Sequence, residues 1–185
     1  MSITRGFIAV LTVLMGVTRF HYGDGHAFWP DASLAVFFLL GYLSSRPALL
    51  AGFLGLAATI DVLAVTAGGI SSYCFTPAYA MLLPAYAAVW LAGRYGRCRQ
   101  WSPLNPALAG LTLLGCSAAF LISEVGFYLY SGIVRSDVLS YAGSILRYYP
   151  SYVLPGLAYV MILLCAGTID RYRSVVFATR NPVQP

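Results

Sequence analysis

The stretch ALLAGFLGLAATIDVLAVTA, residues 48 to 67, is strongly apolar and contains a single charged side chain, Asp61. About 20 mostly apolar residues cross the hydrocarbon core of a bilayer as one helix, so this stretch predicts a transmembrane helix. Five further apolar runs are separated by segments rich in Gly, Pro, Ser or charge, and the pattern predicts an all-α, polytopic membrane protein with six transmembrane helices. These runs lie near residues 6 to 20, 33 to 45, 76 to 93, 106 to 130 and 151 to 169.

The composition of the whole chain agrees with this pattern. Of its 185 residues, 59% are hydrophobic and 9% are charged, whereas roughly 25% of the residues in a soluble domain are charged. Six helices with short connections use this length, so we expect residues 1–185 to form a single transmembrane domain folded as a compact bundle. Arg19 and Phe20 follow the first run where a signal peptide would have small residues, so this run is also predicted to be a span.

The basic residues predict how the bundle lies in the membrane. All eleven are arginines, and with six spans and the N-terminus inside, eight are cytoplasmic and three are external. Cytoplasmic connections carry the excess of basic residues, so both termini are predicted to be cytoplasmic. The net charge of +5 does not indicate a nucleic-acid site, because the arginines flank the spans and form no continuous stripe. The three external arginines are Arg19, Arg135 and Arg147.

Asp61 lies within the third run, past the middle of the membrane on its outer side. A charged side chain at such a depth costs at least about 2.5 kcal/mol and normally faces a partner or a cavity. One interpretation is structural: a hydrogen bond to Ser, Thr or Tyr of another helix, or a salt bridge to an external arginine. The other interpretation is a direct contact with a bound ligand. The residues alone leave both open.

Cys74 differs from the other three cysteines. Cys116 and Cys165 lie within apolar runs, where a thiol usually packs as a small hydrophobic group, and Cys98 is predicted to be cytoplasmic. Cys74 is the one cysteine expected on the oxidising side, and it has no external partner. This argues against a structural disulfide and against a quinone-linked disulfide-forming enzyme, which needs paired external cysteines.

The residues after Cys74 predict a reactive thiol. Thr76 is placed to cap the fourth span and Pro77 suits its first turn, so Cys74 is expected beside the positive end of a helix dipole, where a thiolate is favoured. A thiolate acts as a nucleophile or as a soft metal ligand. The external histidines, His21 and His26, do not supply the three or four regularly spaced ligands of a zinc site. One thiolate with one imidazole suits an axial position on a metal that a macrocycle already holds.

The layout of the chain resembles a family of vitamin carriers. Six short spans, cytoplasmic termini and a site built from outer connections are similar to the substrate-binding S-components of energy-coupling factor (ECF) transporters. Within that group, the set Asp61, Cys74, Tyr79 and Arg147, with Cys74 between spans three and four, resembles the BtuM family. These are solitary, cobalamin-specific S-component-like proteins of Gram-negative bacteria. The resemblance implies a multi-pass protein of the bacterial inner membrane.

The resemblance also implies a ligand and roles for these residues. It implies an outward-facing pocket for vitamin B12 (cobalamin) or its precursor cobinamide, with the Cys74 thiolate as an axial ligand of cobalt and the vitamin bound base-off. Asp61, Tyr79 and Arg147 would contact the amide groups of the corrin or hold the shape of the pocket, and His21 would be a neighbour or the second ligand. A corrin has a broad apolar face for aromatic residues and a polar rim, which agrees with this set.

Two further expectations follow from the resemblance. A thiolate opposite cyanide on cobalt weakens the cobalt–cyanide bond, so Cys74 is expected to promote loss of cyanide from cyanocobalamin as a side activity of a transporter.

S-components often dock on a coupling subunit through Ala-x-x-x-Ala in the first span, where this chain has Thr12-V-L-M-Gly16. The chain has no Walker A motif and therefore no ATP site of its own. It either uses an ECF coupling module or works alone.

Two other functions remain open at this point. The first is an intramembrane thiol enzyme with Cys74 as the nucleophile and His21 or His26 as its base, which predicts covalent modification and no colour with corrinoids. The second is an S-component-like transporter of another small molecule, in which Cys74 is only packed at the end of a connection.

Overall fold

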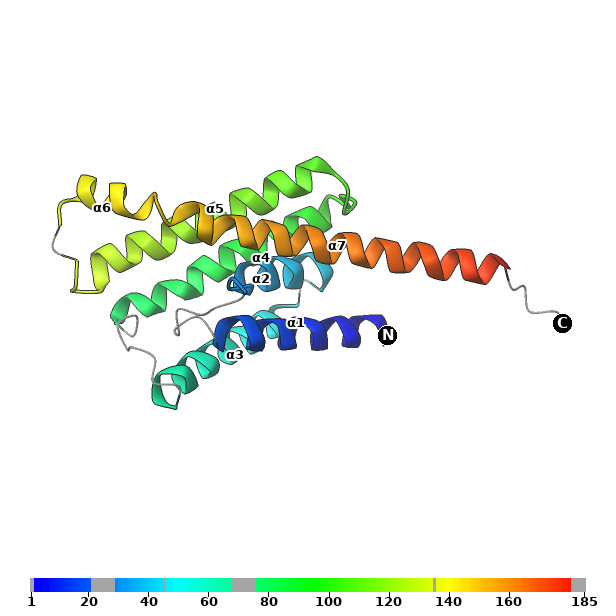
Figure 1. Ribbon diagram of the computed structural model, residues 1–185, viewed down its shortest axis with the longest axis horizontal. Helices are drawn as coiled ribbons and strands as arrows, with labels where there is room; N and C mark the ends of the chain where they lie inside the picture. Colours follow the sequence, from blue (N-terminus) through cyan, green and yellow to red (C-terminus); the bar gives the residue numbers. More distant parts are fainter. Residues whose placement is uncertain (1, 21–28, 45, 68–75, 135, 181–185) are drawn as a thin grey trace.

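The computed structural model of the protein describes residues 2–20, 29–44, 46–67, 76–134 and 136–180 (Figure 1). Within these ranges the chain is helical and contains no strand, as the apolar runs predict. The elements are α1 (Ser2–Phe20), α2 (Ser33–Leu43), α3 (Pro47–Thr66), the 3₁₀-helix η2 (Pro77–Met81), α4 (Leu82–Cys98), α5 (Pro106–Tyr130), α6 (Val138–Ile145) and α7 (Tyr149–Arg180).

Three of these helices are long and apolar enough to cross a membrane. They are α3, α5 and the Tyr149–Thr168 part of α7. Each is predominantly apolar while burying only a minority of its residues inside the bundle, which is the composition expected of helices that face lipid. The chain is therefore a membrane protein.

The long helices alternate in direction, and this gives the bundle two distinct ends (Figure 1). Helices α1, α3 and α5 end, and α2, α4 and α7 begin, at the end that carries the short helix α6; we call this the α6 end. Helix α1 begins and α7 ends at the opposite end, which we call the terminal end. The segments that contain His21 and Cys74 both leave from helices at the α6 end.

Helix α2 is the centre of the bundle. Its residues 33–41 are all buried, and it packs against α1, α3, α4, α5 and α7. At 11 residues it is roughly 16 Å long, about half the thickness of a hydrocarbon core. The helix predicted for the second run is confirmed, but its length and burial are those of a core helix, which explains why its sequence is apolar on every side.

Two glycines allow α2 and α4 to cross in direct backbone contact. A Cβ atom on Gly41 of α2 would lie 2.0 Å from the Trp90 carbonyl oxygen, and one on Gly93 of α4 would lie 2.0 Å from the Phe38 carbonyl oxygen. No side chain fits at either position, because real Cβ contacts never approach so closely. This crossing sets the distance between α4 and the central helix.

Helix α6 is an element that the apolar runs do not predict. It lies within residues 131–150, which the runs assign to an external connection. The Asp137 side chain caps it by accepting hydrogen bonds from the Ser140 amide (3.1 Å) and the Ser140 hydroxyl (2.7 Å). The Tyr141 hydroxyl donates to Glu124 Oε2 (2.7 Å) and thereby ties α6 to α5. The run 106–130 coincides with α5, and the runs 6–20 and 48–67 match α1 and α3 to within a few residues. The run 76–93 covers η2 and most of α4, and α7 continues to Arg180, past the predicted end at residue 169.

Candidate functional site

The most polar contact inside the bundle joins α1 to α3 at the α6 end. Arg19, in the last turn of α1, forms a two-pronged ion pair with Asp61 of α3. Its Nε lies 2.6 Å from Asp61 Oδ1 and its Nη2 lies 2.6 Å from Asp61 Oδ2. Such a fork-to-carboxylate pairing is the strongest geometry available to these two groups. The structural interpretation of Asp61, a salt bridge to an arginine, is the arrangement found here.

Arg19 also contacts α2 and α4. Its Nη1 donates to the Ser33 hydroxyl (2.8 Å) at the start of α2 and to the Tyr86 hydroxyl (2.7 Å) of α4. Asp31 Oδ2 lies 3.6 Å from Nη1, and Asp31 Oδ1 accepts from the Ser33 amide and hydroxyl. The guanidinium is thus held from several sides, and its side chain is only 9% exposed.

Tyr79 extends this network to η2. Its hydroxyl donates to Asp61 Oδ2 at 2.7 Å, so the carboxylate accepts three hydrogen bonds from two side chains. Two of the residues predicted to form the site, Asp61 and Tyr79, are therefore in direct contact. We refer to the whole set as the Arg19 cluster: Arg19, Asp31, Ser33, Asp61, Tyr79 and Tyr86.

The charges of the Arg19 cluster explain why the chain accepts a carboxylate at this depth. An unpaired Asp61 would lose its hydration without compensation, whereas the arginine and the Tyr79 hydroxyl replace its water molecules with fixed donors. The aromatic ring of Tyr86 stacks on Phe37 of α2, with ring centroids 4.3 Å apart, so the cluster rests directly on the apolar core. The cluster is consequently both polar and rigidly packed.

The other predicted site residues are not part of this contact. Arg147 lies in the link between α6 and α7 and is exposed. In Figure 1, α6 and α3 lie on opposite sides of the bundle. His21, His26 and Cys74 lie outside the described residues, so their predicted roles stay predictions.

The predicted cap of the fourth span is wrong in one respect. Thr76 occupies the N-cap position of η2, but its side chain makes no capping hydrogen bond, and its Oγ1 is buried without a partner among the described residues. The element it precedes is a five-residue 3₁₀-helix, and the α-helix begins only at Leu82. This 3₁₀-helix runs directly into α4, so the helical segment still begins at Pro77 and only the predicted side-chain cap is missing.

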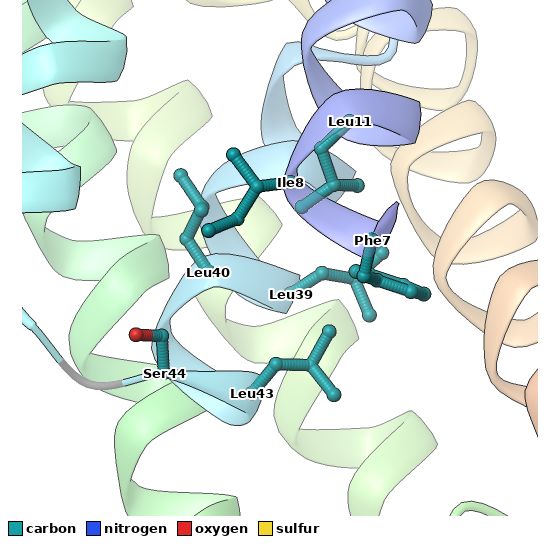
Figure 2. Close-up of a pocket in the computed structure, with 7 residues that line it drawn as sticks. All are labelled: Phe7, Ile8, Leu11, Leu39, Leu40, Leu43 and Ser44. Atoms are coloured by element: carbon teal, nitrogen blue, oxygen red, sulfur yellow. The ribbon is translucent and has the colours of Figure 1, made fainter. Parts of the chain in front are cut away.

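Two small cavities lie near the elements of the site. One, of about 130 Å³, lies between α3, η2 and α4 and touches the Arg19 cluster through Tyr79 and Tyr86. The other, of about 120 Å³, lies between α1 and α2 near the terminal end, and Figure 2 shows its apolar lining. Pockets for drug-sized ligands measure about 300–1,000 Å³, so neither cavity holds a corrinoid by itself. The second is lined by Phe7, Ile8, Leu11, Leu39, Leu40, Leu43 and Ser44.

The three described cysteines are free thiols that differ in burial. Cys116 is fully buried between helices, with its Sγ 3.0 Å from where a Cβ on Gly156 would lie, as predicted for a packed thiol. Cys165 is half-buried and Cys98 is exposed. Within the described parts of the chain, no three His, Cys, Asp or Glu side chains gather as a metal site would require.

Sequence reasoning missed Arg19 as a member of the site. It counted Arg19 only among the external arginines, whereas the side chain lies in the last turn of α1 and is buried in the ion pair. The available signals were Arg19 at the edge of an apolar run and Asp61 within another, which together call for a pair. No protein-family model matches the chain, and no curated protein matches it either.

Proposed function

We propose that the protein binds cobalamin or cobinamide at the outer face of the bacterial inner membrane and takes part in its uptake. In this proposal the bundle spans the membrane six times, with the terminal end in the cytoplasm and the α6 end outside. The observation that carries the proposal is the contact between Asp61 and Tyr79. Two of the four residues behind the resemblance to the BtuM family meet at the end of the bundle from which the Cys74 segment leaves.

The proposed roles follow from how each side chain is occupied. Asp61 already accepts three hydrogen bonds, so it holds the shape of the pocket and does not contact the corrin. Tyr79, which lines the cavity between α3, η2 and α4, holds the shape of the pocket in the same way. The Cys74 thiolate is the axial ligand of cobalt, and His21 is its neighbour or the second ligand. Arg147, which is exposed, contacts the amide rim of the corrin.

The cost of a buried ion pair favours a binding role over a purely structural one. Replacing such a pair with apolar residues of similar volume is often neutral or stabilising, so stability alone is a weak reason to keep it. Ionisable residues inside a membrane usually mark a ligand or ion site. The Arg19 cluster, which contains one arginine and two aspartates, fits the second description.

An equilibrium titration tests the proposal. The purified protein, Cys74→Ala and the control Cys98→Ala are titrated with cyanocobalamin and with cobinamide while the visible spectrum is recorded. We expect the parent and Cys98→Ala to bind and to give a base-off, thiolate-ligated spectrum, and Cys74→Ala to lose that spectrum. If all three proteins leave the spectrum unchanged and bind nothing, the proposal is wrong, and covalent labelling of Cys74 by an acyl or disulfide substrate would favour the thiol enzyme.

Cyanide loss is a separate step of the proposal. The Cys74 sulfur forms a bond to cobalt(III) as the base leaves it, and cyanide departs from the opposite face with its bonding electron pair, so cobalt keeps its oxidation state. We expect the parent and Cys98→Ala to release cyanide from bound cyanocobalamin, and Cys74→Ala to release none. Binding without any cyanide release in the parent would remove this step and leave the binding proposal intact.

Helix α1 carries the small-residue face on which a coupling subunit would dock. Thr12 is exposed on α1, and a Cβ on Gly16 would meet no atom of the described residues within 4 Å. This small-residue face is therefore open for a second helix to approach closely, as docking on an ECF coupling module requires. Cobalamin-dependent growth of cells with and without such a module distinguishes energised uptake from uptake by this chain alone.

A further inference from the structure

We propose that Arg19 is a positioning residue for the substrate site: its guanidinium fixes the Asp61 carboxylate and, through it, the Tyr79 hydroxyl. The inference rests on the proposed function and adds to it a residue that neither the apolar runs nor the resemblance assigns to the site. It is argued entirely from side chains of α1, α2, α3, η2 and α4.

Arg19 uses most of the hydrogen-bonding capacity of its guanidinium. An arginine has five N–H donors, and four of those in Arg19 are committed to Asp61, Ser33 and Tyr86. The side chain is 9% exposed. A group so enclosed has little freedom to bind a ligand itself, so its effect on a ligand is exerted through the residues that it holds.

The residues that Arg19 holds come from different elements of the bundle. Arg19 belongs to α1, Ser33 to α2, Asp61 to α3 and Tyr86 to α4, and Asp61 in turn holds Tyr79 of η2. One side chain thus sets the relative positions of five elements at the α6 end. Helices α1 and α3 both end at the α6 end, so a shift of the arginine displaces these ends relative to η2 and α4.

Tyr79 is linked to Arg19 through Asp61. Its hydroxyl reaches the same Asp61 oxygen, Oδ2, that Arg19 Nη2 holds at 2.6 Å. If the arginine is removed, the carboxylate is free to rotate, and the Tyr79 hydrogen bond no longer defines where η2 sits. In metal sites, loss of the outer partners that orient the ligands typically changes affinity by about 10–100-fold, and we expect an effect of the same order here.

A set of three variants tests whether Arg19 acts through Asp61. Arg19→Gln, Asp61→Asn and the double variant are titrated with cyanocobalamin, and their thermal unfolding is recorded in the same detergent. We expect each single variant to weaken binding about 10–100-fold and the double variant to bind no more weakly than the weaker single one. The fraction of bound corrinoid with the parent spectrum should fall in parallel, which a general loss of stability alone does not cause.

The control and the outcomes separate this inference from the proposed function. Arg46→Gln removes an exposed arginine at the terminal end and should bind like the parent. If the parent binds and Arg19→Gln binds equally well, or if the two single effects multiply in the double variant, Arg19 is not a positioning residue and only this inference fails. If the parent itself binds nothing, the proposed function fails, and the inference falls with it.

Folding failure of one variant does not remove the test. Arg19→Gln leaves Asp61 charged and without its partner, and this variant is the one most at risk. The double variant removes both charges of the Arg19–Asp61 pair and leaves Asp31, whose side chain is 26% exposed, as the remaining carboxylate, so its comparison with Asp61→Asn remains. Equal affinities of these two proteins support action through Asp61, and a markedly weaker double variant contradicts it.

Discussion

The two ends of helix α2 are held by opposite means. At the α6 end, Ser33 and Phe37 meet the charged and aromatic side chains of the Arg19 cluster. Toward the terminal end, Gly41 meets the backbone of α4 with no side chain between them. The glycine contact excludes every residue that carries a Cβ atom. The ion pair, by contrast, is of a kind that apolar residues of similar volume can replace. The comparison indicates that the glycine crossing serves the fold and that the Arg19 cluster serves the ligand.

Filling the glycine crossing should have the largest effect on stability. In Gly93→Ala the new Cβ would lie 2.0 Å from the Phe38 carbonyl oxygen, and only separation of α2 from α4 relieves the clash. We expect a loss of about 3 kcal/mol or more, at the upper limit of overpacking effects. Thermal unfolding in detergent measures it. Gly55→Ala is the matched control, because its Cβ meets no described atom within 4 Å, and it should be neutral or slightly stabilising.

Breaking the ion pair should have the next largest effect. Arg19→Met leaves the Asp61 carboxylate without its cation, and removal of one partner of a buried pair costs about 3–5 kcal/mol, with the lower value expected because Asp61 is 18% exposed. The apolar double variant Arg19→Met/Asp61→Leu should recover most of this loss. Failure of the double variant to recover would mean that the Arg19 cluster is needed for the fold itself, contrary to the comparison.

Removing single hydroxyl groups at the two ends gives smaller effects. Tyr79→Phe loses a hydrogen bond to a carboxylate, worth about 1.5–3 kcal/mol, and Tyr42→Phe loses one to the Trp101 carbonyl, worth about 1 kcal/mol. We expect only Tyr79→Phe to weaken cyanocobalamin binding. Equal effects of both variants on binding would show that the hydroxyls act through stability alone.

The smallest effect is expected at the exposed N-cap of helix α6, Asp137. Hydrogen bonds from the Ser140 hydroxyl and then from its amide lower the pKa of Asp137. A lowered pKa means that the cap is fully formed above the ordinary carboxyl pKa, near 3.9, and is lost as the pH falls through the lowered value. The protection of the α6 amides, measured relative to the intrinsic exchange rate at each pH, should therefore decrease below about pH 4 in the parent, while Asp137→Ala should show weak protection at every pH.

The helices were accessible to sequence reasoning, and their pairing was not. Apolar runs locate α3 and α5 because their period and length are local properties of the chain. Arg19 and Asp61 are 42 positions apart, and the sequence offered three external arginines as partners for Asp61 without a means of choosing. The Thr76 cap failed for a related reason: a capping residue was recognised, but its geometry depends on whether the next turn is α or 3₁₀.

Helix α6 shows a second limit. Its length of eight residues is too short for an apolar run, and none of its residues is buried, so the search for spans passes over it. The signal that was present is Asp137 three positions before Ser140, a local capping pattern. Helix α2 shows the converse, because a short run that is apolar on every side predicts a buried core helix as well as it predicts a short span.

The most direct test of the account is the colour of the protein as cells make it. The protein and Cys74→Ala are purified in detergent from cells grown with cobalamin, and their visible spectra are compared. The account predicts a corrin spectrum shifted to a base-off, thiolate-ligated form in the parent, and its loss or change in the variant. A colourless parent that also fails to bind added cobalamin would contradict it.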